Sequence, residues 1–384
     1  FDELLAGSDG WGWVEKDGRI ASPDVVYPEL EGRRVVDGHD LHLTLDLWTQ
    51  HVAEQELDRM VAKFRPRGAV AIVMSCRTGE VLAMASRPDF DPNRFGEFDK
   101  STYRNRALTD AFEMGSTMKG FVAAAALQEG VANLESAFDC ENGAWRVRPG
   151  RTLHDHHPYG VLTLLGIIAH SSNIGIAKVA ALLGAPRLHH YLTRLGFGGP
   201  TGIDLPGEAC GMLHPLAAWT VDSMASIPMG HEITATPLQL LTAFNSFATG
   251  GVLLLPRILE RAVSQDGDTS HRFAPLTIHR IFDPSVVRGP VTTLLVSVVE
   301  EGTAQKVKLQ GVEIAGKTGT AEKYADGKYV SSFVCFAPAD DPEITVLVLA
   351  DEPTAGGSHY GGTVAGPTAR EIIRRVLPLA TGGN

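Results

Sequence analysis

The sequence predicts an α+β fold in which strands from both ends of the chain form one central antiparallel sheet flanked by helices. Near-continuous apolar runs are typical of strands buried on both faces, and such runs occur in the first and the last quarter of the chain. Short polar turns join neighbouring runs, so antiparallel pairing is expected. The expected strands are 69–74, 81–85, 312–320, 330–337 and 344–350.

Helices are expected before, between and after these two groups of strands. Apolar residues recur at helical spacing after Trp48. A helix that begins near Ser116 reaches Gly130, a typical stop residue. Residues 131–310 indicate mostly helices and loops. The clearest helical patterns cover 48–64, 116–130, 162–183, 237–247 and 366–377.

The composition is that of an ordinary globular protein, with 44% hydrophobic and 21% charged residues among 384. The formal net charge of −11 and the lack of a Lys/Arg run argue against nucleic-acid binding. No stretch reaches the roughly 18 apolar residues of a membrane span, and no signal peptide is visible. The cysteines show no CxxC or Cys/His ligand spacing, so their disulfide status stays open: they are Cys76, Cys140, Cys210 and Cys335.

The first 39 residues differ in character from the rest of the chain. Glycines recur there among charged residues, and apolar periodicity is weak. This predicts a small annex without a core of its own. We therefore expect a division into 1–39 and 40–384. Because the chain begins at Phe1 without an initiator methionine, we also expect it to be a piece of a longer protein.

The sequence Ser116-Thr-Met-Lys119 lies where a helix is expected to begin. Its spacing places Ser116 Oγ and Lys119 Nζ on one helix face, close enough to exchange a proton. Serine is a weak nucleophile that needs an adjacent base. Lysine can be that base only if burial and the helix N-terminus lower its pKa. By itself, the motif is better explained by a helix-capping serine and a solvated lysine.

A second polar group, Ser171-Ser172-Asn173, interrupts an apolar helical pattern. Small polar residues in such a setting need hydrogen-bond partners. Ser171 can relay protons there, and Asn173 can bind a substrate amide. A helix kink or a local cap explains the group equally well.

The third group, Lys317-Thr318-Gly319-Thr320, ends the strand expected at 312–320. Alternation places Thr318 and Thr320 on one face, where two hydroxyls can hold a carboxylate. Gly319 leaves room for a substrate backbone along the strand edge, and Lys317 adds positive charge. A polar turn after an edge strand is the simpler alternative.

The three groups together are far more specific than any one of them. SxxK, SxN and KTG, in this order, are the signature set of penicillin-binding proteins and class A β-lactamases. The chain resembles the transpeptidase domain of class B penicillin-binding proteins along nearly its full length. It departs from that family at Met114, where proline is usual, and at Met118, where phenylalanine is common. The matching stretches are 43–46, 78–84, 88–93, 104–107, 115–119, 171–175, 233–239, 301–303, 315–321, 336–339 and 360–365.

The resemblance implies a role for each motif residue. Ser116 is similar to the acylated nucleophile, Lys119 to its general base and Ser171 to a proton shuttle. Asn173 is similar to the residue that grips the amide of the donor peptide.

In the third motif, the resemblance makes Lys317 an electrostatic support and Gly319 part of the substrate-binding strand. Thr318 and Thr320 would hold the terminal carboxylate of the substrate. Backbone N–H groups of Ser116 and Thr320 would form the oxyanion hole.

The implied fold is the penicillin-binding transpeptidase fold, which is similar to that of serine β-lactamases, with 1–39 as the remnant of an N-terminal pedestal. The implied function is that of a peptidoglycan D,D-transpeptidase that is acylated by β-lactams. Asn173 and the segment 360–365 are more similar to the septal, FtsI-type branch with its sporulation relatives than to the elongation branch. A D,D-carboxypeptidase or a β-lactamase of the same fold is one alternative. A non-catalytic β-lactam sensor or divisome scaffold is another.

The resemblance also implies partners and a location. The partners would be stem peptides, β-lactams and membrane proteins of cell division, including a glycosyltransferase. The location would be the outer face of the cytoplasmic membrane, through an N-terminal anchor that this chain lacks. No cofactor is expected. Residues 154–157, His-Asp-His-His, are not expected to hold a metal because adjacent residues rarely converge on one tetrahedral ion.

Overall fold

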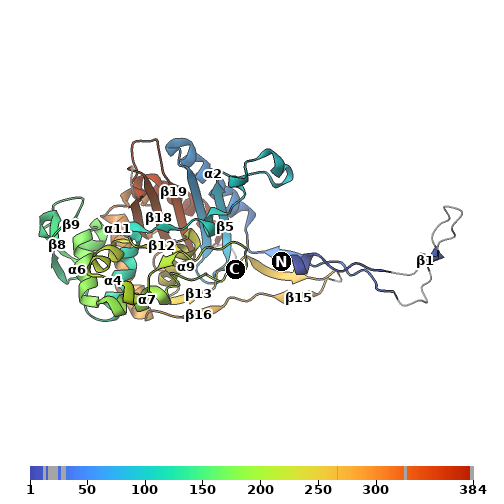
Figure 1. Cartoon of the computed structure of the whole chain (residues 1–384), viewed down its shortest axis with the longest axis horizontal. Helices are drawn as coiled ribbons and strands as arrows, with labels where there is room; N and C mark the ends of the chain where they lie inside the picture. Colours follow the sequence, from blue (N-terminus) through green and yellow to red (C-terminus); the bar gives the residue numbers. More distant parts are fainter. Residues whose placement is uncertain (12–13, 16–24, 27–31, 266, 324–326, 381–384) are drawn as a thin grey trace. The chain divides into compact units, whose positions relative to one another are not determined.

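The computed structural model describes the chain except residues 12–13, 16–24, 27–31, 266, 324–326 and 381–384 (Figure 1). The chain forms two compact units. The first unit contains 1–44 and 258–274, and the second contains 45–257 and 275–384. Much of the annex expected at 1–39 lies outside the described residues.

The first unit is built on a small antiparallel sheet. β3 (Asp40–Leu43) pairs with β14 (Leu259–Val263), and β14 pairs with β15 (Thr269–Arg272). This long-range pairing brings the later segment into the unit, and the periodicity of either segment alone does not reveal it. The other elements of the unit are α1 (Asp2–Leu5), β1 (Val14–Glu15) and β2 (Val25–Val26).

The second unit contains the predicted central sheet, which is five-stranded and antiparallel with the order β17-β18-β19-β4-β5. The two groups of strands meet where β19 pairs with β4, which confirms that both ends of the chain build one sheet. β17 begins later than expected because Val312 instead bridges to Leu309. The strands are β4 (Gly68–Ser75), β5 (Val81–Arg87), β17 (Ala315–Glu322), β18 (Tyr329–Ala337) and β19 (Ile344–Asp351).

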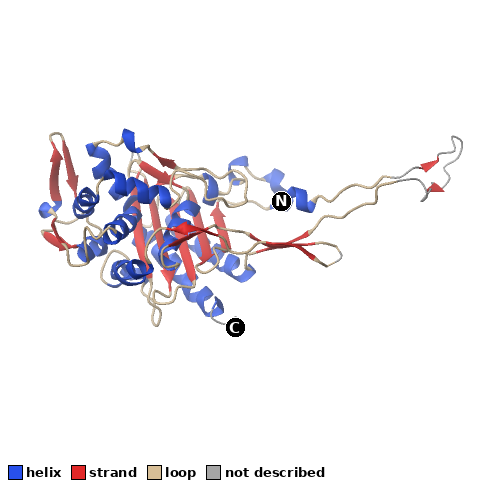
Figure 2. Ribbon diagram, turned by 90° about the horizontal axis from the view of Figure 1, so that it is seen from below, coloured by secondary structure: helices blue, strands red, loops and turns tan. Residues whose placement is uncertain are grey.

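Helices flank this sheet (Figure 2). Because 69–74 and 330–337 are buried throughout, both faces of the strands are covered, as their apolar runs predicted. Phe121 of α4 stacks on Phe247 of α9 at 5.2 Å between ring centroids, which joins these two helices in the core. The packed helices are α2 (Leu47–Phe64), α4 (Met118–Gln128), α9 (Pro237–Ala248), α11 (Thr292–Glu300) and α13 (Gly366–Ala380).

The middle of the chain contains short strands that the sequence did not predict. Each has only two to five residues, too few for alternation to be recognised. Within the described part of the chain, every helix is too short or too polar to cross a lipid bilayer. The short strands are β6 (Phe112–Glu113), β7 (Ala137–Asp139), β8 (Ala144–Arg148), β9 (Arg151–His154), β10 (Val161–Thr163), β11 (Met212–Leu213), β12 (Ile233–Ala235), β13 (Val252–Leu254) and β16 (Thr277–Arg280).

The helical pattern expected at 162–183 forms two helices, with a break at the polar group Ser171-Ser172-Asn173. α5 (Leu164–His170) ends at Ser171, whose φ of 61° is left-handed. Ser172 then caps α6 (Asn173–Leu183) by accepting a hydrogen bond from the Gly175 N–H at 2.9 Å. The polar residues therefore interrupt the helix, and their hydroxyl and amide groups lie at the interruption.

A close contact between two glycine backbones fixes the segment before Ser116. Gly115 opens the 3-10 turn η3 (Gly115–Thr117) and donates its N–H to Gly230 O at 3.3 Å. Gly230 has a φ of 85°, and a Cβ there would lie 2.1 Å from Gly115 O. A Cβ on Gly115 would lie 2.7 Å from Thr320 O. The turn that carries Ser116 is thus held directly between another loop and β17.

Replacing Gly230 by alanine is expected to lower the free energy of unfolding by about 2–5 kcal/mol. The left-handed backbone accounts for about 1–2 kcal/mol, and overpacking against Gly115 adds about 1–3 kcal/mol. Chemical denaturation measures the loss. Gly130→Ala is the matched control, because Gly130 has a φ of 64° and no atom within 4 Å of its Cβ position. If Gly230→Ala and Gly130→Ala lose the same free energy of unfolding, the close contact between Gly230 and Gly115 does not contribute to the effect.

Candidate active site

Ser116 lies in η3, directly before α4, and its side chain is partly exposed. The expected start of a helix near Ser116 is confirmed. Thr117 Oγ1 donates to Met114 O at 2.8 Å, which ties the turn together. Met114 and Met118, the two departures from the family pattern, are both buried in the core.

Lys119 is completely buried one turn after Ser116. Its Nζ donates to Ser171 O at 2.5 Å, to Ser171 Oγ at 3.1 Å and to Asn173 Oδ1 at 2.6 Å. Burial lowers the pKa of Lys119 well below its ordinary value, and the charge of Lys317 lowers it further, against the opposing effect of Asp155. The first two motifs therefore meet at a lysine whose neutral form is favoured.

Lys317 of β17 reaches the same hydroxyl from the sheet. Its Nζ donates to Ser171 Oγ at 3.2 Å and to Thr318 O at 3.4 Å. Burial lowers the pKa of Lys317 to about 7. A hydroxyl has two lone pairs and one proton. Because both lysines donate to Ser171 Oγ, the Ser171 proton is free to be donated to a third group.

Asp155 holds the Ser171 turn from the loop after β9. Its carboxylate accepts hydrogen bonds from Ser172 Oγ at 2.6 Å and from the backbone N–H groups of Asn173 and Ile174. A carboxylate at the N-terminus of α6 also interacts favourably with the helix dipole. The sequence patterns did not predict this role for Asp155. In the described parts of the chain, no group of three or more His, Cys, Asp or Glu residues is placed to hold a metal ion.

The hydroxyls of Thr318 and Thr320 are each fixed by a neighbour that the sequence analysis did not single out. Thr318 Oγ1 lies 2.8 Å from Thr303 Oγ1. Thr320 Oγ1 accepts from the Gly361 N–H at 3.2 Å, which leaves its own proton available for a ligand. Thr303 and Gly361 belong to the stretches 301–303 and 360–365, which resemble the family, and this resemblance was the only indication in the sequence that they matter to the site.

Gly319 allows β17 to approach the segment that carries Ser116. A Cβ at this position would lie 2.2 Å from Ser332 Oγ, 2.9 Å from Thr117 Cγ2 and 3.0 Å from Met114 O. Every larger residue would therefore separate the strand from the turn. The absence of a side chain at Gly319 therefore lets the KTG strand pack directly against the turn that carries Ser116.

Aromatic rings form one wall beside β17. Tyr329 and His359 stack at 3.9 Å between ring centroids, and His359 lies 4.6 Å from Tyr360. His156, from the loop that contains Asp155, meets Tyr360 edge-on at 5.8 Å. Burial lowers the pKa of His156. This wall offers apolar contact next to the three motifs.

The chain is similar in sequence to proteins of known family, and these similarities agree with the arrangement of the three motifs. The family model described as "Penicillin binding protein transpeptidase domain" matches residues 69–374. The chain is 37% identical to "Stage V sporulation protein D" of Bacillus subtilis over 350 residues, which cover 89% of this chain and 54% of that protein. It is 37% identical to "Probable peptidoglycan D,D-transpeptidase PenA" of Neisseria gonorrhoeae over 379 residues, or 97% of this chain and 62% of the relative. The chain thus spans little more than half the length of these relatives.

A solved structure is also similar. The chain resembles penicillin-binding protein 3 of Mycobacterium tuberculosis, solved in complex with aztreonam, with a TM-score of 0.85 and 28% identity. The match covers 91% of this chain and 81% of the other. The predicted α+β transpeptidase fold is therefore confirmed.

The buried Lys317 predicts a specific dependence of stability on pH. Lys317 is neutral in the folded chain above its pKa of about 7, whereas the unfolded chain keeps the proton up to the ordinary value of 10.5. Between these values the unfolded state binds more protons, so the free energy of unfolding rises with pH. Lys317→Met removes this contribution. Its stability is expected to rise less steeply than that of the parent chain, by up to about 1.4 kcal/mol per pH unit.

Urea denaturation at several pH values between about 7.5 and 9.5 measures these slopes. Lys306→Met, at an exposed lysine, is the matched control and should keep the slope of the parent chain. An unchanged slope in Lys317→Met would mean that Lys317 stays charged in the folded state.

Proposed function

The chain belongs to the penicillin-binding protein transpeptidase family, and we propose that it is a serine D,D-transpeptidase that cross-links peptidoglycan stem peptides. The observation that supports this most strongly is the convergence of Lys119 and Lys317 on Ser171 Oγ. Such an arrangement suits a reaction in which protons move to and from a serine nucleophile and a leaving amine.

In the first step, neutral Lys119 takes the proton of Ser116 Oγ, which attacks the carbonyl carbon of the penultimate D-Ala. Backbone N–H groups of Ser116 and Thr320 stabilise the oxyanion. The C–N bond then breaks, Ser171 delivers its proton to the leaving nitrogen and takes the proton held by Lys119, whose Nζ lies 3.1 Å from Ser171 Oγ, and D-Ala departs. Ser116 is left as an ester of the donor peptide.

In the second step, the amine of a neighbouring stem peptide attacks this ester. A new amide bond forms, the amine loses a proton through the same groups, and Ser116 Oγ regains its own. Asn173 holds the donor amide during both steps. Thr318 and Thr320 hold the terminal carboxylate of the intact donor next to Lys317, and Gly319 belongs to the strand along which the donor lies.

The biological setting follows from the relatives and is part of the same proposal. The names of the relatives include sporulation and FtsI-type proteins, which supports a role in septal or sporulation-associated wall synthesis. The whole protein would work outside the cytoplasmic membrane with division partners, including a glycosyltransferase, and 1–39 would be the end of its pedestal.

Penicillin provides the direct test of the nucleophile. One covalent adduct is expected, mapped by mass spectrometry to Ser116. Ser116→Ala should abolish labelling, whereas Ser101→Ala, at an exposed serine, should not. Persistent labelling of folded Ser116→Ala would reject the assignment. Slow loss of the adduct is expected of a transpeptidase, whereas rapid hydrolysis would favour a β-lactamase.

Carboxylate recognition by Thr320 is tested by Thr320→Val, which keeps the shape and the backbone N–H. A lost hydrogen bond to a charged group costs about 1.5–3 kcal/mol, so acylation by penicillin should slow by about tenfold to a hundredfold. A penicillin with its carboxylate esterified should show a smaller defect. Equal losses for acid and ester would mean that Thr320 serves packing rather than carboxylate recognition.

A further inference from the structure

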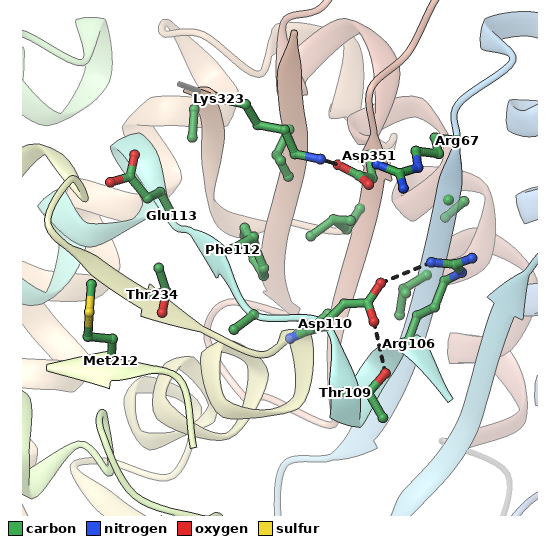
Figure 3. A pocket seen from close by; sticks show the side chains of 18 of the residues that line it. Arg67, Arg106, Thr109, Asp110, Phe112, Glu113, Met212, Thr234, Lys323 and Asp351 are labelled. Atoms are coloured by element: carbon green, nitrogen blue, oxygen red, sulfur yellow. Dashed lines mark hydrogen bonds and ion pairs between the residues drawn. The ribbon is translucent and has the colours of Figure 1, made fainter. Parts of the chain in front are cut away.

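A cavity of about 630 Å³ lies next to the active-site strand (Figure 3). It begins at Ala321, directly after Thr320, and at Glu113, three residues before Ser116. None of the three motifs lines it. Its size is within the usual range for ligand sites in proteins, about 300–1,000 Å³.

The floor of this cavity is one row of residues across the sheet. Ala321 of β17 pairs with Val330, Val330 with Asp351, and Asp351 with Gly68 of β4. All four residues line the cavity. Neighbouring strands lie about 4.8 Å apart, so three spacings make a path of about 14 Å. We call this path from β17 to β4 the arginine trough, after the residues at its far end.

Arginines gather at the β4 end of the trough, around Gly68. Arg106 has a side chain that is only 8% exposed, and a Cβ on Gly68 would lie 3.3 Å from its Nη1. Arg104 and Arg106 each lie 3.0 Å from the same oxygen of Asp110. The exposed Arg67 also lines this end and pairs with Glu352 at 3.3 Å. One carboxylate is therefore shared between two guanidinium groups.

The hydrogen bonding of Arg106 is incomplete. Its Nη1 contacts Asp110, whereas its buried Nε has no hydrogen-bond partner among the described residues. A buried unsatisfied donor is costly and needs an explanation. Because guanidinium groups match the geometry of carboxylates, an incoming carboxylate is the ligand that would complete this end of the trough.

The other cations and anions around the trough are largely paired with one another. Lys323 forms ion pairs with Asp351 and with Glu352. At the opposite end, Glu113 accepts hydrogen bonds from the Glu232 N–H at 3.1 Å and contacts His231 Nδ1 at 2.8 Å. Figure 3 shows Glu113 far from Arg67 and Arg106. Among the cationic side chains described for the trough, the buried donor without a hydrogen-bond partner is Arg106 Nε, at the arginine end.

The proposed function gives this trough a direction. The donor carboxylate would lie at Thr318 and Thr320, and the reacting carbonyl would lie at the N–H groups of Ser116 and Thr320. The part of the donor upstream of that carbonyl would then pass Ala321, where the trough begins. An extended peptide covers about 3.3–3.6 Å per residue, so the next two to four residues would lie along the trough.

We propose that the arginine trough binds the upstream part of the donor stem peptide and that Arg104 and Arg106 hold a carboxylate there. The inference rests on the proposed function, because that function defines the donor and its direction. It adds a specificity site for a chemical class of substrate, acyl-D-Ala-D-Ala peptides that carry an upstream anion. Penicillin has no such upstream peptide, so its reaction does not use this site.

Two donor pentapeptides test this proposal, L-Ala-γ-D-Glu-L-Lys-D-Ala-D-Ala and the same peptide with the glutamate α-carboxylate amidated. The parent chain should release D-Ala from the acid at least tenfold faster than from the amide, compared as kcat/KM. Arg104→Gln should remove most of this preference while leaving acylation by penicillin within twofold. Arg106→Gln should do the same if it folds, and Arg104→Gln keeps the test valid if it does not.

Arg94→Gln is the matched control, because Arg94 is also a half-exposed arginine paired with an aspartate, at 3.2 Å, but lies outside the trough. It should keep the full preference for the acid. Equal rates for acid and amide in the parent chain, or an equal effect of Arg94→Gln and Arg104→Gln, would overturn the proposal.

Binding without reaction separates this proposal from the proposed function. Calorimetry of the two pentapeptides with Ser116→Ala needs no acylation. Tighter binding of the acid, lost in the double variant with Arg104→Gln, supports the trough even if the chain fails to cross-link peptides. Equal affinity for acid and amide would reject the trough even if penicillin labels Ser116 as expected.

Discussion

The site depends on two buried lysine side chains that converge on one serine hydroxyl. Lys119 and Lys317 are both completely buried, and both donate to Ser171 Oγ. Burial lowers the pKa of each lysine, because an ammonium group loses its hydration in the protein interior. Because each lysine has a lower pKa in the folded state than in the unfolded state, burying it reduces the free energy of unfolding. Other interactions in the unit must offset this loss.

The backbone around these lysines is arranged to bring three separate elements into contact. Ser171 adopts a left-handed conformation, which is unusual for serine, and Asp155 holds the residues that follow it. Gly115 and Gly230 are positions where a Cβ would collide with neighbouring backbone, and a Cβ on Gly319 would collide with the side chains of Ser332 and Thr117. The same close contacts that place Ser116 therefore leave little freedom for substitution, although none of these glycines carries a reacting group.

Apolar patterns predicted the parts of the fold that depend on burial alone. The runs at 69–74 and 344–350 form neighbouring strands, and both are buried on two faces as their apolar composition predicted. The break at Ser171 was left open by the sequence, since a polar group inside an apolar pattern fits a kink or a cap as well as a functional site. The motif order identified Ser116, Lys119 and Lys317 as candidates, but not Asp155, whose hydrogen bonds depend on where a distant loop returns.

The arginine trough shows why such features escape sequence analysis in general. Its floor joins residues from β17, β18, β19 and β4 in one row, and that row exists only in one register of the sheet. A shift of one residue in any pair would turn every side chain of the shifted strand to the other face. Arg106 packs closely over Gly68, where a Cβ would lie 3.3 Å from the arginine Nη1. A ligand site that depends on strand register has no local sequence pattern, so its charge and its unsatisfied donor become visible only after the strands are paired.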